Sequence, residues 1–303
     1  MRIQKLFIRT RVLRNNISSY IFWLIGITGS SLVLIIAIGL LIKSLPMIHK
    51  FGLLNSLVSI EWFPLRGKFG LLPFIISSGY VSVLSLILTV PVCLFTAIYL
   101  VEYAHKRMLI IFYPLIDILS GLPSVIFGVW GVIVIVPFIR DYAAPLFGVH
   151  STGYSILAGS IVLSVMLIPN VMLVFIEIFK TVPSELRDAS LSLGATRWET
   201  IKYVVLRKSL PGIIAGVVLG MSSAFGETLA VLMVVGNLVQ IPGSVFDPGY
   251  PLPALIANNY GEMLSIPLYD SALLYAAFVL LIIVIFFNIL SKLILRKVTI
   301  YIR

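Results

Sequence analysis

The residue with the clearest capacity for chemistry is Glu227, a carboxylate inside a long apolar stretch, between Gly226 and Thr228. A carboxylate in hydrocarbon costs several kcal/mol, so Glu227 is expected to face a bundle interior or a watery path. Ser222 and Ser223 lie one turn earlier, and their hydroxyls are able to hydrogen-bond to a neighbouring helix. Two interpretations stay open: Glu227 belongs to a solute pathway or gate, or it only caps or bridges broken helices.

A second group of residues predicts a bent helix. The run Gly121-Leu-Pro-Ser124 is followed closely by Gly128-Val-Trp-Gly131. Pro123 removes one backbone hydrogen bond, and the glycines allow close packing or local unwinding. The segment is either a kinked packing helix or a bent element that lines a translocation route.

Asp117 and Glu177 lie near the ends of predicted spans, where a carboxylate reaches water.

The sequence lacks the signatures of an enzyme. It has no H-E-x-x-H motif, and His49, His105 and His150 are scattered over loops, so we expect no metal site. It has no G-x-x-x-x-G-K-[ST] motif, so the chain does not hold nucleotide phosphates by itself. No Ser or Cys stands with a base at a recognisable spacing, although an intramembrane hydrolase stays open as an alternative. We therefore expect a protein that is not an enzyme and that uses no cofactor.

Composition indicates which kind of protein positions these residues. The 303 residues are 60% hydrophobic and 11% charged. Soluble domains carry about a quarter charged residues, so the chain is expected to be an integral membrane protein. The net charge of +10 does not indicate nucleic-acid binding, because the basic residues flank apolar runs and no nucleic-acid-binding motif accompanies them. The single Cys93 lies in an apolar run and forms no disulfide framework.

Apolar runs of about 20 residues or more predict an all-α protein with six transmembrane helices. The predicted spans are 19–42, 73–100, 110–139, 154–179, 212–240 and 271–290. The first apolar run is longer than that of a cleaved signal peptide and is expected to be retained. Of the 22 Lys and Arg residues, 17 lie in the N-terminal segment, alternate loops and the C-terminal tail. Positive charge marks the cytoplasmic side, so both termini and the polar passage 180–211 are predicted to be cytoplasmic.

The passage 180–211 has a structured pattern of its own. Leu186, Ala189 and Leu193 form one narrow apolar helix face. Gly194 stands where a helix ends in the left-handed conformation. Thr196 and Glu199 form a capping box that starts the next helix. The pattern predicts two short helices joined by a sharp glycine corner.

This passage resembles the cytoplasmic "EAA" loop of ABC-importer permeases, whose pattern is E-A-A-x3-G-x9-I-x-L-P. The matching residues are Asp188, Ala189, Ser190, Gly194, Val204 and Leu206. Arg207 stands where the pattern has Pro. The blocks Gly121–Gly131 and Ala224–Val231, with Gly236-Asn237 after them, are similar to the phosphate-importer permease subunit of PstC type. The resemblance covers nearly the whole chain.

The resemblance implies a type I ABC-importer permease fold with a cytoplasmic coupling-helix loop, in the inner (plasma) membrane of a prokaryote. It implies an N-terminal segment of residues 1–72, a permease domain of residues 73–292 and a basic tail of residues 293–303. The implied partners are an ATP-binding subunit dimer, a second permease subunit of PstA type, an external solute-binding protein and membrane lipid. The expected substrate-pathway residues are Glu227, Thr228, Ser223, Ser124 and Asn237. The expected ATPase-coupling residues are Leu186, Asp188, Ala189, Leu193, Gly194 and Thr196.

One departure from the family leaves the substrate open. The family carries Arg four residues before the glutamate of its Gly-Glu-Thr motif, and this chain has Ser223. Phosphate is the first expectation and molybdate or sulfate the alternative, because a fold does not fix a substrate. A homodimer of permeases also stays open. A different class of function, an ion-coupled carrier or channel that uses Glu227, is the remaining alternative.

Overall fold

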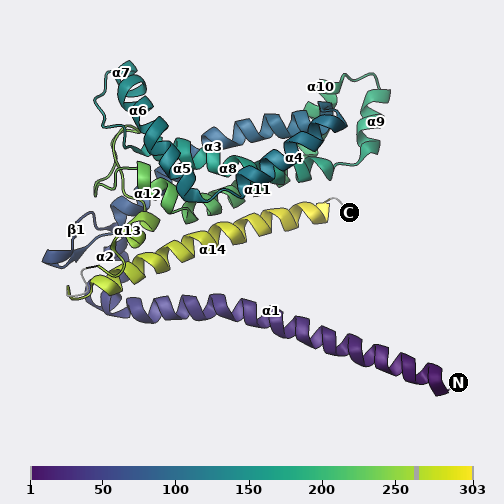
Figure 1. Cartoon of the computed structure of the whole chain (residues 1–303), viewed down its shortest axis with the longest axis horizontal. Coiled ribbons are helices and arrows are strands. Elements are labelled where there is room, and N and C mark those ends of the chain that lie inside the picture. The colour runs from purple at the N-terminus through teal and green to yellow at the C-terminus, as the bar shows by residue number, and fades with distance from the viewer. Residues whose placement is uncertain (1, 263–265, 302–303) are drawn as a thin grey trace.

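The computed structural model describes residues 2–262 and 266–301, and most of these residues are helical (Figure 1). Within the described residues, six helices are long and apolar enough to cross a membrane: Ser18–Phe51, Leu72–Tyr103, Ser124–Leu146, Ile156–Lys180, Arg197–Gly226 and Tyr269–Arg296. The predicted all-α class with six spanning helices is therefore confirmed. The end of the predicted tail, residues 302–303, lies outside the described residues.

The long helices are α1 (Arg2–Phe51), α3 (Leu72–Ile98), α8 (Ile156–Lys180), α11 (Leu206–Gly226) and α14 (Tyr269–Tyr301). The shorter elements are α2 (Leu53–Val58), β1 (Trp62–Phe63), β2 (Lys68–Phe69), α4 (Lys106–Ser120), α5 (Ser124–Trp130), α6 (Val136–Phe138), α7 (Ala144–Leu146), α9 (Ser184–Ser192), α10 (Arg197–Thr200), α12 (Leu229–Val234) and α13 (Leu252–Asn259). Single π-helical turns, at Gly131–Ile135, Ile139–Ala143 and Ile201–Val205, join neighbouring helices without a break.

Two predicted spans are wrong in the same way, because each contains a break. The span predicted at 110–139 is divided into α4 and the helix that starts at Ser124. Pro123 has no N–H and holds extended backbone at ψ 138°, so the helix restarts after it. The span predicted at 212–240 is divided at Glu227, whose backbone is extended at ψ 132°. Beyond α12 the chain leaves the helix at Gly236 and Asn237, both with positive φ.

The structure confirms part of the prediction for the polar passage 180–211 and corrects the rest. α9 is a separate short helix, Gly194 adopts the left-handed conformation at φ +88°, and Thr196 and Glu199 form the capping box, so these three predictions are confirmed. The second helix is not short. It continues from α10 through a π-helical turn into α11, because no residue before Gly226 ends it and Pro211 is accommodated inside the helix.

The loops predicted at 43–72 and 241–270 carry structure of their own. Within the first, β1 and β2 form an antiparallel hairpin, and the second contains α13. The hairpin is anchored by Trp62, whose ring packs edge-on against those of Phe69 and Phe74. Trp62 is 8% exposed, so this end of the molecule has a small aromatic core. Residues 263–265 of the second loop lie outside the described residues.

The centre of the bundle is the pair α3 and α8, which pack along most of their length. Small and hydroxyl-bearing residues allow the close approach. Thr89 Oγ1 donates to the Ser164 carbonyl at 3.2 Å, and Ser160 Oγ donates to the Val81 carbonyl at 3.4 Å. Lipid is as apolar as the helix surfaces, so the hydrophobic effect does not drive membrane helices together. Close packing and hydrogen bonds of this kind hold them together instead.

The start of α1 and the end of α14 lie at the same end of the molecule as α9 and α10, at the right of Figure 1. The hairpin with β1, together with α13 and α7, lies at the opposite end. This arrangement agrees with the charge pattern, in which the two termini and the passage 180–211 share one side of the membrane.

Gly153 is expected to be the most sensitive glycine of the region that joins the third and fourth spans. Its φ is +88°, and a Cβ added there would lie 2.2 Å from the Val136 carbonyl oxygen. Left-handed backbone alone costs an L-residue about 1–2 kcal/mol. Gly153→Ala should therefore lower the free energy of unfolding in detergent by about 3–4 kcal/mol, since strain and a backbone clash add.

Gly148→Ala is the matched control for Gly153→Ala. Gly148 also has positive φ, +67°, but a Cβ there would meet no described atom within 4 Å. Only the backbone strain of about 1–2 kcal/mol should remain. If the two variants lost the same free energy of unfolding, the close approach of Gly153 to Val136 would be absent from the folded protein.

Candidate functional site

Two helix breaks meet at Glu227. Its carboxylate lies near the backbone N–H groups of Thr228 and Ala230, at the start of α12, and near the Ser124 hydroxyl, at the start of α5. The first N–H groups of a helix have no partner within the helix, and the helix dipole favours negative charge there. One carboxylate therefore lies beside the N-terminal ends of two short helices.

The two short helices are held together by small residues. A Cβ added at Gly128 in α5 would lie 2.6 Å from Met233 Sδ and 3.3 Å from Ala230 Cα in α12. Gly131 is packed as closely, against Val162 of α8 and Val234 of α12. The glycines of the bent segment thus allow α5, α12 and α8 to touch, which accounts for their spacing.

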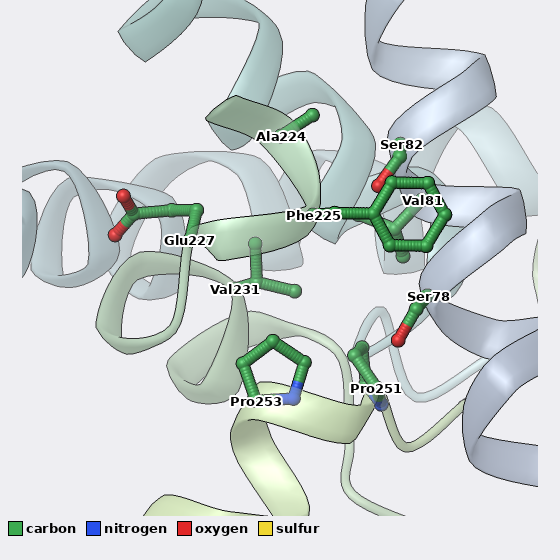
Figure 2. Close-up of a pocket in the computed structure, with 9 residues that line it drawn as sticks. All are labelled: Ser78, Val81, Ser82, Ala224, Phe225, Glu227, Val231, Pro251 and Pro253. Atoms are coloured by element: carbon green, nitrogen blue, oxygen red, sulfur yellow. The ribbon is translucent and has the colours of Figure 1, made fainter. Parts of the chain in front are cut away.

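A small cavity lies behind the α11–α12 break (Figure 2). It is lined by Ser78, Val81, Ser82, Ala224, Phe225, Glu227, Val231, Pro251 and Pro253. Figure 2 shows the Phe225 ring on the side of Ser82, while the Glu227 carboxylate points to the opposite side. The free volume for a water-sized molecule is about 10 Å³, which is about the space of one water. In this state the cavity is closed to a larger solute.

The predicted pathway residues are only partly brought together. Glu227, Thr228 and Ser124 meet at the junction of α5 and α12. Ser223 is one turn earlier on α11, exposed, and its hydroxyl donates to the Leu219 carbonyl of the same helix. Asn237 lies beyond the other end of α12, where its amide donates to the Leu232 carbonyl at 2.8 Å. Asn237 is thus separated from Glu227 by the length of α12.

The predicted coupling residues form an elbow, which we define as residues 181–196, from the end of α8 to the start of α10. None of the nine residues of α9, all described by the structure, is buried. Leu186 is 41% exposed and Leu193 is 89% exposed. Asp188, Ala189, Gly194 and Thr196 lie on the same elbow, and none of them is buried. An apolar face so accessible is typical of a surface that another protein covers.

The elbow is tied to the bundle by polar contacts. Ser190 Oγ lies 2.9 Å from Thr200 Oγ1 on α10. The Arg187 guanidinium donates to Glu102 Oε1 at 2.9 Å and to the Phe179 carbonyl at 3.0 Å. No group of three or more His, Cys, Asp and Glu side chains within the described residues is placed to hold a metal ion.

The family of the chain follows from comparison with known proteins. Residues 89–300 match the family described as "Binding-protein-dependent transport system inner membrane component". The chain belongs to this family. The match includes both helix breaks and the elbow, so the resemblance drawn from the sequence motifs is confirmed.

Curated relatives agree with this family. The chain is 40% identical over 211 residues to the probable ABC transporter permease protein YqgH of Bacillus subtilis, covering 69% of this chain and 67% of that protein. It is 34% identical to the phosphate transport system permease protein PstC of Xylella fastidiosa, covering 80% and 78%. It is 33% identical to the probable PstC of Methanocaldococcus jannaschii, covering 84% and 85%.

A solved structure supports the fold. One chain of the MetNI methionine ABC transporter, in an inward-facing native crystal form, aligns with a TM-score of 0.52 and 18% sequence identity. The alignment covers 78% of this chain and 96% of that chain. The protein is thus a multi-pass membrane permease with the fold of ABC-importer permeases.

Sequence reasoning missed two features of this permease. The first is the serine face of α3, whose Ser78 and Ser82 line the cavity; their spacing of four residues was the available signal. The second is the role of Glu102, which lies in a short charged turn of the sequence. Its partner Arg187 is 85 positions away, and no local pattern connects the two.

Proposed function

We propose that this permease moves phosphate into the cytoplasm as the PstC-type subunit of an ABC importer. The observation that carries the proposal is its similarity to relatives named PstC, which extends over about four fifths of both chains. Ser223 in place of the family's Arg removes a basic group from the pathway. The alternative is therefore an importer of another oxyanion, molybdate or sulfate.

The proposed mechanism is alternating access. Two ATPase subunits close on ATP and tilt the permease pair, so that a path opens first to the outside and then to the inside. The elbow faces the cytoplasm, as do both termini, and its exposed face enters a groove of the ATPase as a short amphipathic helix. A second, PstA-like permease completes the pair, and a solute-binding protein docks on the opposite end, where the hairpin and α13 lie. Membrane lipid surrounds the spans.

Successive segments of the chain are proposed to have different roles. Residues 1–72 insert first and supply external surface, residues 73–292 are the permease domain, and residues 293–303 are a cytoplasmic tail. The pathway runs past the junction of α5 and α12, where Glu227, Thr228 and Ser124 meet, and includes Ser223 and Asn237. Because hydrolysis occurs on the partner ATPase, this subunit itself catalyses no reaction.

Uptake by the reconstituted complex tests the proposal. Vesicles that hold this permease, its second permease and its ATPase, with the binding protein and phosphate on one side and ATP on the ATPase side, should transport labelled phosphate. Uptake of molybdate or sulfate should be at least about tenfold slower, which corresponds to about 1.4 kcal/mol of discrimination. Faster molybdate or sulfate uptake would identify the alternative oxyanion.

A second measurement separates the importer from a carrier. Vesicles that hold this chain alone should show no phosphate flux under a proton or sodium gradient. Autonomous gradient-driven flux would contradict the importer and support an ion-coupled carrier that uses Glu227.

A further inference from the structure

A single guanidinium joins three segments at the elbow. Arg187 Nε and Nη2 donate to Glu102 Oε1 at 3.1 and 2.9 Å, and the same group donates to the carbonyl oxygens of Phe179 and Val182. The Arg187 and Glu102 side chains are 19% and 13% exposed. A pair so shielded from water depends on both partners, because removing one leaves the other charge buried and uncompensated.

The three segments belong to different regions of the bundle. Arg187 is in α9, and Phe179 is in the last turn of α8, whose carbonyls lack helical partners and favour a cation. Glu102 lies in the π-helical turn Tyr99–Tyr103, which extends α3 without a break. The guanidinium therefore links the exposed helix of the elbow to the end of the long helix α3.

No other side-chain hydrogen bond or ion pair of α9, among the described residues, reaches α3. Ser190 bonds to Thr200 of α10, and Ser192 bonds within α9. The chain itself connects α9 only to α8 and α10. At its other end α3 carries Ser78 and Ser82, which line the cavity beside Glu227. The Glu102–Arg187 pair therefore links α9 to the helix that carries this wall of the cavity.

We propose that Glu102 and Arg187 are a positioning pair that makes α3 follow α9 when the ATPase moves the elbow. The pair does not touch the solute. It makes a movement of the elbow move α3, which lines the cavity. The pair therefore sets how many solute molecules are moved for each ATP hydrolysed. This inference rests on the proposed function of the chain as an ATP-driven importer.

The test is the coupling ratio of the full reconstituted complex, phosphate moved per ATP hydrolysed. Glu102→Gln keeps the shape and an acceptor oxygen but removes the charge, and should lower the ratio at least about fivefold, the low end of coupling between linked sites. Arg187→Lys keeps the charge but loses the paired N–H donors of the guanidinium. Its ratio should lie between those of the wild type and Glu102→Gln. Glu177→Gln is the matched control, because it makes the same chemical change in an exposed ion pair with Lys180, at the end of α8 and outside the elbow, and exposed pairs contribute little.

A purely structural role gives a different result. It would reduce the amount of assembled complex, and phosphate uptake and ATP hydrolysis would fall together with the ratio unchanged. An unchanged ratio in both Glu102→Gln and Arg187→Lys would overturn the proposal. If the wild-type complex shows no ATP-dependent uptake of any oxyanion, the proposed function fails before the variants are compared.

A distance measurement decides the matter even where a variant fails to assemble. Spin labels at Ser184→Cys on α9 and Tyr103→Cys at the end of α3, with the buried Cys93 replaced by Ser, report whether the two helices move together. The distance between the labels should change by less than about 2 Å between the nucleotide-free and ATP-bound complex, as for helices that move as one unit. A larger change would overturn the proposal.

Discussion

Leu193→Asp is expected to weaken binding of the ATPase strongly while leaving the fold of the permease unchanged. The side chain is 89% exposed, so its replacement by a carboxylate costs the isolated chain little. Full burial of a leucine side chain in a groove is worth about 1.5–3 kcal/mol, and a buried carboxylate adds a desolvation cost. We expect the affinity for the ATPase to fall at least about a hundredfold, or about 2.7 kcal/mol, with uptake lost in proportion.

Leu65→Asp is the matched control for Leu193→Asp. Leu65 is 85% exposed, at the tip of the hairpin at the opposite end of the molecule. Its replacement makes the same chemical change at nearly the same exposure, and should leave ATPase binding unchanged. If Leu193→Asp binds the ATPase as tightly as Leu65→Asp does, the exposed face of the elbow is not the docking surface.

Glu227→Gln is expected to lower phosphate uptake by about ten- to a hundredfold. The carboxylate lies beside donor groups at the starts of α5 and α12, and hydrogen bonds from such groups to a charged acceptor are worth about 1.5–3 kcal/mol. The amide cannot accept from both helix ends equally, because one of its two polar atoms is a donor. The junction of the two short helices should therefore lose its fixed geometry, and with it the pathway.

The measurement for Glu227→Gln is uptake per assembled complex over a range of pH. Glu61→Gln is the control, since Glu61 is a half-exposed carboxylate of the hairpin paired with Lys68, and exposed pairs contribute little. Uptake by Glu227→Gln that equals the wild type at every pH would leave Glu227 with a capping role alone. The pathway assignment of the residues around it would then be lost.

The elbow was predictable because its signals are local. The left-handed Gly194 and the Thr196–Glu199 capping box each depend on residues within one or two turns, and both are present. The apolar spacing of Leu186, Ala189 and Leu193 predicted a face but not its partner, and the structure leaves that face unburied. The predicted length of the second helix was wrong, since a π-helical turn carries it past the expected end.

The two helix breaks were not predictable from hydropathy, because an apolar window does not distinguish one long helix from two short ones. Pro123 predicted a kink, yet the chain leaves the helix fully there, since Gly128 in α5 and Gly131 just after it allow close packing against α12 and α8. At Glu227 the break places the carboxylate near Ser124, which is 103 positions earlier (227 minus 124). The contact of Arg187 with Glu102 was not predictable either, because sequence patterns report only neighbours within a few turns.

Access to Leu193 tests the central claim, that a cytoplasmic elbow transmits work from a separate ATPase to this bundle. The Leu193→Cys variant, with the buried Cys93 replaced by Ser, is treated with a membrane-impermeant maleimide in intact cells and in inside-out vesicles. We expect labelling only in the inside-out vesicles, and loss of labelling when the purified ATPase subunit is added. Labelling from outside intact cells, or labelling that the ATPase leaves unchanged, would contradict the account.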